Sequence, residues 1–238
     1  MSAYLVRGIL IDLGFPAIWG ELGPFLEQAR PVAAFITHHH EDHAGNAEMV
    51  ARRSLPLAAS AATIALLTEN APIELHRRLI WGAPERLSAH VEQFPSTALR
   101  LIHTPGHTSD HHVVWDAERE TLFAGDLFLG VKVRSAHRGE DPRQIAQSVR
   151  AAAALKPARM FDSHRGSVTN PVDSLLAKAD WLDNTIAAID RRIAAGWSDR
   201  AITRDVLGRE DAVYYVSSGA MSKINLVRAV RRSGRRDQ

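Results

Sequence analysis

Four histidines and two acids lie between residues 38 and 43 of the stretch THHHEDHAG. Among them, His38, His40, Asp42 and His43 form the pattern H-x-H-x-D-H. Imidazole nitrogens and carboxylate oxygens are ligands for zinc and related ions. Because residues two apart at a strand end point to the same side, His38 and His40 can share one ion, while the turn redirects Asp42 and His43 toward a second. The spacing therefore predicts a site for two metal ions.

Three later motifs carry further side chains of this kind. HTPGHTSDHH contains His107, LFAGDLF contains Asp126 and FDSHRG contains His164. Each follows an apolar, strand-like segment and includes a glycine-containing turn, which is where side chains from separate strands can converge at one sheet edge. The chain has no cysteine, so every ligand must be a nitrogen or an oxygen atom. The predicted ligands are His38, His40, Asp42, His43, His107, Asp126 and His164.

Apolar segments lead into these motifs and favour strands. We expect strands at residues 4–12 and 32–37, the second of which ends at the histidines. The pattern then becomes helical over residues 42–53. Alternation of strands and helices predicts an α/β layered fold. Residues 70–97 have a mixed pattern without a firm assignment, and segments of this sort often cover an active site.

Strand patterns return in the second half of the chain. Asp141 followed by Pro142 predicts a helix start, and that helix should run to about residue 155. Helical patterns dominate from residue 171 onward. We therefore expect a core that carries the metal motifs over residues 1–170 and a C-terminal helical region over residues 171–238. The expected strands of the second half are a meander at residues 99–103, 111–115 and 121–124, and a further strand at residues 159–162.

The order of the motifs resembles that of the metallo-β-lactamase superfamily of hydrolases, and ILIDLG near the start is similar to its second-strand motif. The resemblance covers about residues 4–170. It implies an αββα four-layer sandwich around a two-metal site. It also implies the division of the ligands: His38, His40 and His107 for the first ion, Asp42, His43 and His164 for the second, and Asp126 as the bridge between them.

The resemblance further implies two zinc ions per chain, although the all-nitrogen-and-oxygen ligand set also suits iron or manganese. Two neighbouring ions can share a water molecule, lower its pKa and polarise the bond to be cleaved. We expect Asp42 to orient this water and to help protonate the leaving group. The predicted reaction is hydrolysis of a small ester, thioester or lactone.

Other residues near the motifs have predicted supporting roles. By strand alternation His39 points away from the ligands, so we expect it to pack or to support them. The resemblance implies that Asp12 supports the metal loop from beneath. Asp110 and His111 stand where the family often has glycine and histidine, which predicts a different pocket wall. Four histidines have no motif around them, and we expect surface or core positions for His76, His90, His103 and His137.

Two other activities stay open. Residues 196–208, with Ser198 as a helix cap, and the arginine-rich tail could form a helix-turn-helix-like binder, which would favour an RNA or DNA phosphodiesterase. Clustered arginines are more often a solvated face, so we do not expect a nucleic-acid partner. A mononuclear iron persulfide dioxygenase can share the histidine motif but would need ligands at one site only. His40 stands where a flavodiiron-type site has glutamate, which argues against oxygen reduction.

The composition indicates one folded main domain, because 45% of the 238 residues are hydrophobic and 24% are charged. A net charge of +2 says little about a nucleic-acid partner. The N-terminus lacks the pattern of a signal peptide, and the longest uncharged run is too short to span a bilayer. We expect a cytoplasmic protein without a membrane span. An exposed sheet edge could support a homodimer.

Overall fold

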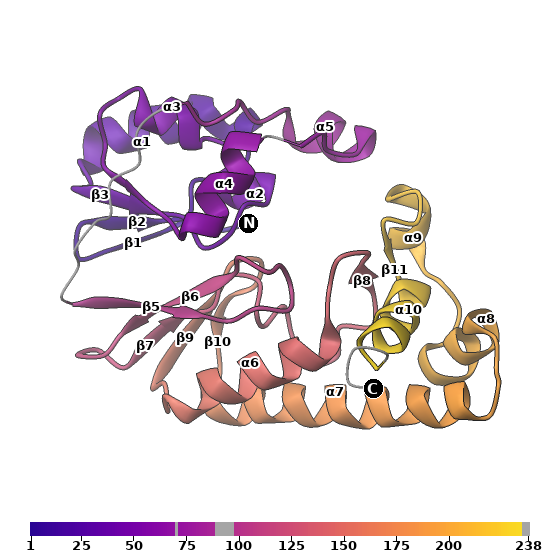
Figure 1. Cartoon of the computed structure of the whole chain (residues 1–238). Helices are drawn as coiled ribbons and strands as arrows, with labels where there is room; N and C mark the ends of the chain where they lie inside the picture. Colours follow the sequence, from indigo (N-terminus) through magenta and orange to yellow (C-terminus); the bar gives the residue numbers. More distant parts are fainter. Residues whose placement is uncertain (70, 89–97, 235–238) are drawn as a thin grey trace.

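Two β-sheets pack face to face, and helices cover their outer faces (Figure 1). The structure is a computed structural model that describes residues 1–69, 71–88 and 98–234. The architecture is the αββα sandwich expected from the sequence. The first sheet has the strand order β1 (Tyr4–Val6), β2 (Ile9–Ile11), β3 (Ala33–Phe35) and β4 (Leu57–Ala58). The second has the order β10 (Gly166–Val168), β9 (Arg159–Asp162), β7 (Thr121–Phe123), β6 (His112–Asp116) and β5 (Leu99–His103).

The space between the sheets is filled by apolar side chains that alternate along the strands. Ile9 and Ile11 of β2 point into this layer, whereas Leu10 between them faces the helices outside the first sheet. Tyr4 contacts the rings of Phe123 and Phe161, with centroids 5.5 and 5.3 Å away. Because strand side chains alternate between faces, each sheet contributes to an inner and an outer core.

Helices of the N-terminal half cover the outer face of the first sheet. Leu22 and Leu26 of α1 pack there with Val50 of α3. The helices of this half are η1 (Pro16–Ile18), α1 (Trp19–Ala29), α2 (Glu41–Ala44), α3 (Ala47–Ala51), α4 (Ala61–Glu69) and α5 (Leu75–Trp81). None of the described helices has both the length and the apolar character needed to cross a membrane.

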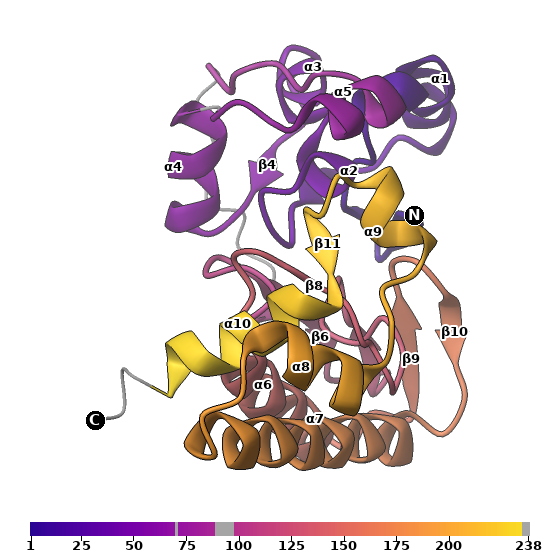
Figure 2. The ribbon, with the colours of Figure 1, turned by 90° about the vertical axis from the view of Figure 1, so that its right-hand side faces the viewer.

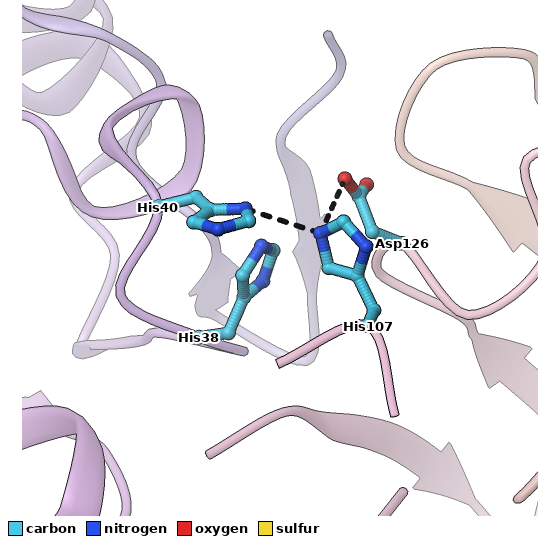
Figure 3. Close-up of side chains that lie close together, drawn as sticks. All are labelled: His38, His40, His107 and Asp126. Carbon is cyan, nitrogen blue, oxygen red and sulfur yellow. Dashed lines mark hydrogen bonds and ion pairs between the residues drawn. The ribbon is translucent and has the colours of Figure 1, made fainter. Parts of the chain in front are cut away.

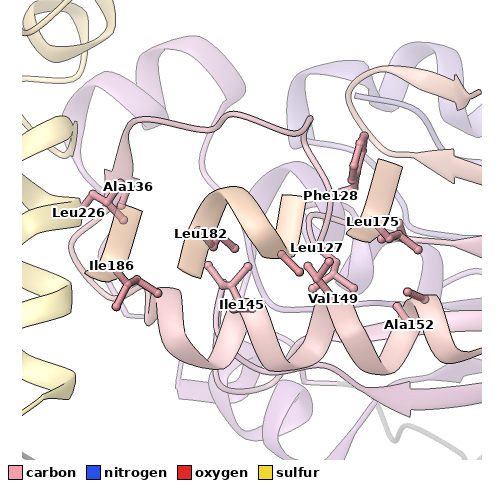
Figure 4. Packing of buried hydrophobic residues seen from close by; sticks show 14 of the residues in the cluster. Leu127, Phe128, Ala136, Ile145, Val149, Ala152, Leu175, Leu182, Ile186 and Leu226 are labelled. Carbon is pink, nitrogen blue, oxygen red and sulfur yellow. The ribbon is translucent and has the colours of Figure 1, made fainter. Parts of the chain in front are cut away.

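Two long helices, α6 (Pro142–Ala154) and α7 (Pro171–Ala194), cover the outer face of the second sheet (Figures 1 and 4). The predicted helix start is confirmed, and the Asp141 side chain caps it by accepting hydrogen bonds from the backbone N–H groups of Arg143 and Gln144. Val149 and Leu175 are fully buried where the two helices meet. Burying such side chains stabilises the fold by roughly 1.5–3 kcal/mol each.

The C-terminal segment folds back along the side of the second half. Leu226 and Val227 of its last helix are buried in the same cluster as α6 and α7. The division of the chain between residues 170 and 171 stays a prediction. The elements outside the two large sheets are β8 (Ala136–His137), α8 (Asp199–Ile202), a π-helical turn η2 (Thr203–Leu207), α9 (Ala212–Val216), β11 (Met221–Ser222), which pairs with β8, and α10 (Lys223–Ser233).

The segment predicted as one strand over residues 4–12 is a tight hairpin, so that prediction was wrong in detail. Arg7 and Gly8 both have positive φ, 51° and 77°, and reverse the chain between β1 and β2. Arginine is uncommon in this conformation. Its guanidinium group is held 2.8 Å from the buried carboxylate of Asp116 on β6. A distant partner, which the local sequence does not indicate, therefore stabilises the turn.

The helix expected over residues 42–53 is divided into α2 and α3 by Gly45 and Asn46. The side chain of Asn46 donates hydrogen bonds to the carbonyl oxygens of Leu13 and Phe15, at 3.0 and 2.9 Å. A Cβ atom at Gly45 would lie 2.4 Å from the ring of Pro16, so the chains approach too closely for a larger residue. This contact fixes α2 and its side chains against the loop that follows β2.

Candidate metal centre

The loop after β3 carries the first histidines and is anchored from beneath by Asp12. The Asp12 carboxylate accepts hydrogen bonds from the Thr37 backbone N–H at 2.8 Å and from the Thr37 hydroxyl at 3.0 Å. It also lies 2.7 Å from Nδ1 of His43. A carboxylate has no hydrogen to give, so His43 Nδ1 must donate, which leaves Nε2 facing the site. The predicted supporting role of Asp12 is confirmed.

His38, His40, His107 and Asp126 form the first group of converging side chains (Figure 3). One ligand atom from each lies within 4.8 Å of the others. His107 Nε2 is 3.1 Å from His40 Nδ1 and 3.4 Å from an oxygen of Asp126. His38 is fully buried, and its Nε2 has no hydrogen-bond partner among the described residues. A buried lone pair without a partner is costly, and a metal ion would satisfy it.

Asp42, His43, Asp126 and His164 form the second group, again within 4.8 Å of one another. An oxygen of Asp126 lies 3.1 Å from His43 Nε2 and 3.2 Å from His164 Nε2. Asp42 lies 3.3 Å from His164 Nε2. Asp126 belongs to both groups. The structure thus brings all seven residues named from the sequence together, in two groups that share one carboxylate.

The two groups differ in their electrostatics. Burial, followed by the neighbouring imidazoles, holds the pKa values of His38 and His40 well below the usual range, so both rings are neutral. Burial also opposes charge on His43, but Asp126 and Asp12 outweigh it and raise the pKa of His43. Hydrogen bonds to Asp126 and Asp42 raise the pKa of His164 to about 9. Without metal, the protons on His43 and His164 therefore balance the negative charges of Asp42 and Asp126. A bound cation would balance these charges instead.

Residues outside the two groups fix the loops that carry them. His39 turns away from the centre, as expected, and its backbone N–H and ring Nδ1 each lie 2.9 Å from Asp110. His111 accepts a hydrogen bond from the Asp126 backbone N–H at 3.0 Å. A Cβ atom at residue 125 would lie 2.7 Å from that ring nitrogen, so Gly125 is needed for this contact. Asp110 and His111 therefore hold the metal loops in place. Both are fully buried and neither lines the cavity at the metal groups, so the prediction that they alter the pocket wall was wrong.

Two further acids, which the sequence analysis did not identify, also support the centre. Glu140 lies 3.3 Å from Nδ1 of His107, on the side of the ring opposite the metal group. Asp162 accepts hydrogen bonds from the backbone N–H groups of Leu129 and His164, at 2.6 and 2.7 Å. Asp162 precedes His164 in the motif FDSHRG, so its role could have been found from the motif. Glu140 has no such local pattern.

A cavity of about 260 Å³ opens onto the two groups. The ring of Trp81 and the side chain of Met221 contribute apolar surface to its wall. Arg77 also lines the cavity, but its guanidinium group is bound to the buried carboxylate of Glu41, at 2.7 Å from one oxygen. The segment between residues 70 and 97 does contribute α5 to the cavity wall, as its mixed pattern suggested.

Two of the histidines without a motif line this cavity. The expectation of an unrelated surface or core position was wrong for His76 and His137. His137 lies on β8, and its ring approaches that of His40 to a centroid distance of 6.1 Å. His103 is exposed and is 2.8 Å from the carbonyl oxygen of Ser109, as expected of a surface residue. His90 lies outside the described residues.

Several residues of the C-terminal segment considered for a helix-turn-helix are used within the fold. Ser198 caps α8 as predicted, but Ile202 and Leu207 are buried against α7 and α10. Arg231 in the last helix is bound to Asp199 at 2.8 Å. Arg235 and Arg236 of the tail lie outside the described residues. The charge of Arg231 is thus paired within the protein.

A family model described as the metallo-beta-lactamase superfamily matches residues 2–180. The Beta-lactamase-like protein 2 homolog of Drosophila melanogaster is 28% identical over 176 residues, which cover 71% of this chain and 58% of the relative. The Hydroxyacylglutathione hydrolase of Xylella fastidiosa (strain M23) is 27% identical over 192 residues, 78% of this chain and 64% of the relative. The chain spans about three fifths of the length of these curated relatives.

Solved structures have the same fold. TTHA1623, solved in a di-iron-bound form, is 25% identical with a TM-score of 0.59, over 72% of this chain and 90% of that one. The metallo-beta-lactamase family protein TTHA1429 from Thermus thermophilus is 17% identical with a TM-score of 0.61. This second match covers 98% of this chain and 88% of that protein, so the shared fold extends into the C-terminal region.

Proposed function

Because the chain belongs to the metallo-β-lactamase superfamily, we propose that it is a metal-dependent hydrolase that holds two ions and cleaves a small ester, thioester or lactone. The observation that carries this proposal is the pair of ligand groups that share Asp126. Two groups joined by one carboxylate match the arrangement in which paired ions act on one substrate. The name of the Xylella fastidiosa relative, a hydroxyacylglutathione hydrolase, supports the class of reaction.

The donor atoms suit zinc, iron or manganese. His38, His40 and His107 would hold the first ion, Asp42, His43 and His164 the second, and Asp126 would bridge them. The buried Nε2 of His38 without a partner among the described residues and the neutral state of His38 and His40 fit metal binding, because a ligating imidazole must offer a lone pair. We propose zinc as the resident ion, while the di-iron form of TTHA1623 keeps iron as an alternative.

When bound, the two ions would supply a water of lowered pKa and would polarise the bond to be cleaved. Among the side chains of the protein, Asp42 then acts as the general base. Its carboxylate lines the cavity, beside His164, and faces the place where both ligand groups meet. Asp42 accepts the proton that the attacking water loses and passes it to the leaving oxygen or sulfur atom. This step needs no other titratable group.

The cavity favours a small substrate of low charge. Trp81, Leu129, Val133 and Met221 give it apolar walls next to the metal groups. The one arginine among the described residues of its wall is neutralised, because Arg77 is bound to Glu41 and lies 3.7 Å from Glu74. A phosphodiester backbone would need cations along its path. The cavity next to the metal groups therefore suits an ester, thioester or lactone better than a nucleic-acid strand.

The dioxygenase alternative needs a single iron site. The second group of Asp42, His43, Asp126 and His164 would then have no role, although four side chains from three separate segments converge there. Two carboxylates and two imidazoles gathered in one place, three of the four side chains buried, offer the nitrogen and oxygen donors of a second metal site. The second group is thus the feature that favours the two-metal hydrolase over the dioxygenase.

Elemental mass spectrometry of protein purified without added metal tests the proposal, together with hydrolysis of a thioester, lactone, aryl ester and phosphodiester panel. We expect about two ions per chain and hydrolysis of at least one carbonyl substrate. His38→Ala should lose metal and activity, whereas His103→Ala, which alters an exposed histidine, should keep both. One iron per chain with oxygen uptake and no hydrolysis would refute the proposal and favour the dioxygenase.

A further inference from the structure

A second cavity, of about 460 Å³, lies in the C-terminal region and is lined by none of the metal-group residues. Its wall comes from α8, η2, the turn before α9, α9 itself and the first turn of α10. Three of its described residues are arginines and two are tyrosines: Arg200, Arg204, Arg209, Tyr214 and Tyr215. No step of the proposed hydrolysis uses this cavity.

The arginines of this cavity have free charges. Arg200, Arg204 and Arg209 are exposed, and their guanidinium groups have no hydrogen bond or ion pair with any described residue. Other arginines of the C-terminal region are paired with acids: Arg192 with Asp205 and Arg231 with Asp199. The three cavity arginines therefore differ from the paired arginines around them.

The one acid among the described residues of the cavity wall is already occupied. The two carboxylate oxygens of Glu210 accept hydrogen bonds from the backbone N–H groups of Lys223 and Ile224, both at 2.9 Å. These N–H groups lie in the first turn of α10 and lack partners within the helix, so Glu210 acts as a cap. The described wall thus carries three arginines and one carboxylate, that of Glu210, which is directed at the start of α10. The cavity is therefore positively charged.

The tyrosines offer flat surfaces beside these charges. Tyr214 is half-buried and packs over Gly219, where a Cβ atom would lie 3.3 Å from the ring. The ring of Tyr215 is perpendicular to it, with centroids 5.2 Å apart, and is 73% exposed. An exposed aromatic ring beside unpaired cations offers a face on which a planar ligand can stack. Tyr214 thus holds its neighbour in place, and Tyr215 presents a free face.

We propose that this cavity binds a nucleoside phosphate, with the phosphates on the arginines and the base on Tyr215. Arginine forms paired, charge-assisted hydrogen bonds with phosphate oxygens, and bases stack on aromatic rings. A volume of about 460 Å³ suits one nucleotide, either free or at the end of a single strand. The proposal concerns a site apart from the metal centre and does not depend on the hydrolase assignment.

The position of the cavity links it to the metal centre. The segment that carries Tyr214 and Tyr215 continues into Ala220 and Met221, which line the metal cavity. Figure 2 shows α9 and β11 of this segment rising from the second half of the molecule toward the first. The segment from Tyr214 to Met221 therefore contributes to the walls of both cavities. A ligand bound in the C-terminal cavity would contact the same segment that borders the metal cavity.

Calorimetric titration of the full chain with ATP, after the metal has been removed with a chelator and the chelator dialysed away, tests the proposal. We expect one ATP per chain, with adenosine and inorganic triphosphate each binding more weakly than ATP. Arg200→Glu and Arg204→Glu should each weaken ATP binding about tenfold or more, and Tyr215→Ala should also weaken it. A 5′-phosphorylated oligonucleotide that binds more tightly than AMP would identify a strand end as the ligand.

Arg100→Glu is the matched control, since Arg100 is an exposed arginine on β5 of the second sheet. This variant should bind ATP like the unaltered chain. All variants should have the melting temperature of the unaltered chain, and Arg204→Glu should keep the hydrolytic activity. A failure of the nucleotide-site proposal can therefore be distinguished from a failure of the hydrolase proposal. Absence of ATP binding at low salt, equal binding of triphosphate and ATP, or binding unaffected by Arg204→Glu would overturn the nucleotide site.

Discussion

Replacing Asp12 by asparagine should weaken metal binding without altering any proposed ligand. Asp12 has φ of 62°, a conformation that asparagine tolerates, so the change adds little backbone strain. The side chain is 1% exposed and its two oxygens serve Thr37 and His43. An asparagine amide can present its oxygen to only one of these donors. If its NH₂ group faces His43, the ring proton moves to Nε2 and blocks the position that faces the metal.

The magnitude follows from the contacts that are lost. Disturbing a carboxylate that orients a metal-binding histidine costs about 10- to 100-fold in metal affinity. This factor corresponds to about 1.4–2.7 kcal/mol for binding at the second group. The metal-free protein should also lose roughly 1.5–3 kcal/mol of unfolding free energy, because the 2.7 Å bond to His43 is buried and charge-assisted. The first group, which Asp12 does not contact through a ring nitrogen, should lose less affinity.

The assay is competition for zinc against a chelator of known affinity, with metal content measured in parallel and urea unfolding of the metal-free protein. Asp180→Asn is the control, because Asp180 pairs with Arg150 at the surface, where such a bond contributes about 0–1 kcal/mol. Equal affinity for both ions and equal unfolding free energy in Asp12→Asn and Asp180→Asn would refute this account of the metal loop.

Further predictions concern the remaining groups. Asp42→Ala should lower kcat by about 100-fold or more when metal content is restored, and an unchanged kcat would remove Asp42 from the proton transfer. Glu140→Gln should weaken the first ion roughly tenfold in chelator competition, whereas Glu21→Gln at the exposed start of α1 should not. The raised pKa of His164, about 9 against an ordinary 6.5, adds stability to the metal-free protein below pH 6.5 that is lost as the pH rises through about 9. Unfolding free energy in chelator should therefore fall between these pH values, and His164→Asn should reduce that fall. Chelation should also abolish hydrolysis, which readdition of zinc restores; activity that persists without metal would contradict the hydrolase proposal.

The sequence alone was sufficient to predict which side chains converge when they lie in one compact motif. His38, His40, Asp42 and His43 are close in the chain, so a strand and a turn bring them together wherever the rest of the fold lies. The α/β layered class also follows from local patterns, because strand alternation and the helix start at Asp141 depend on near neighbours, whereas the four-layer αββα arrangement was implied by the family resemblance. Whether the seven residues bind two ions stays a prediction for the experiments above.

Features that depend on distant contacts could not be predicted. Glu140 reaches His107 from a turn between β8 and α6 that has no metal-binding pattern of its own. His137 lies in the metal cavity because β8 pairs with β11, near the other end of the chain. Arg7 takes a left-handed turn because Asp116 accepts its guanidinium group. In each case the determining partner is far away in the sequence.

The two ligand groups draw their side chains from both halves of the sandwich. His38, His40, Asp42 and His43 belong to the half built on the first sheet, and His107, Asp126 and His164 come from loops of the second. A bound ion would therefore link the two halves, and because it binds the folded chain and not the unfolded one, its binding free energy would add to the stability of the folded state. Such a link can form only after both halves have folded and docked, so it would slow unfolding rather than speed folding. The same ions that serve hydrolysis would thus determine how long the folded molecule lasts.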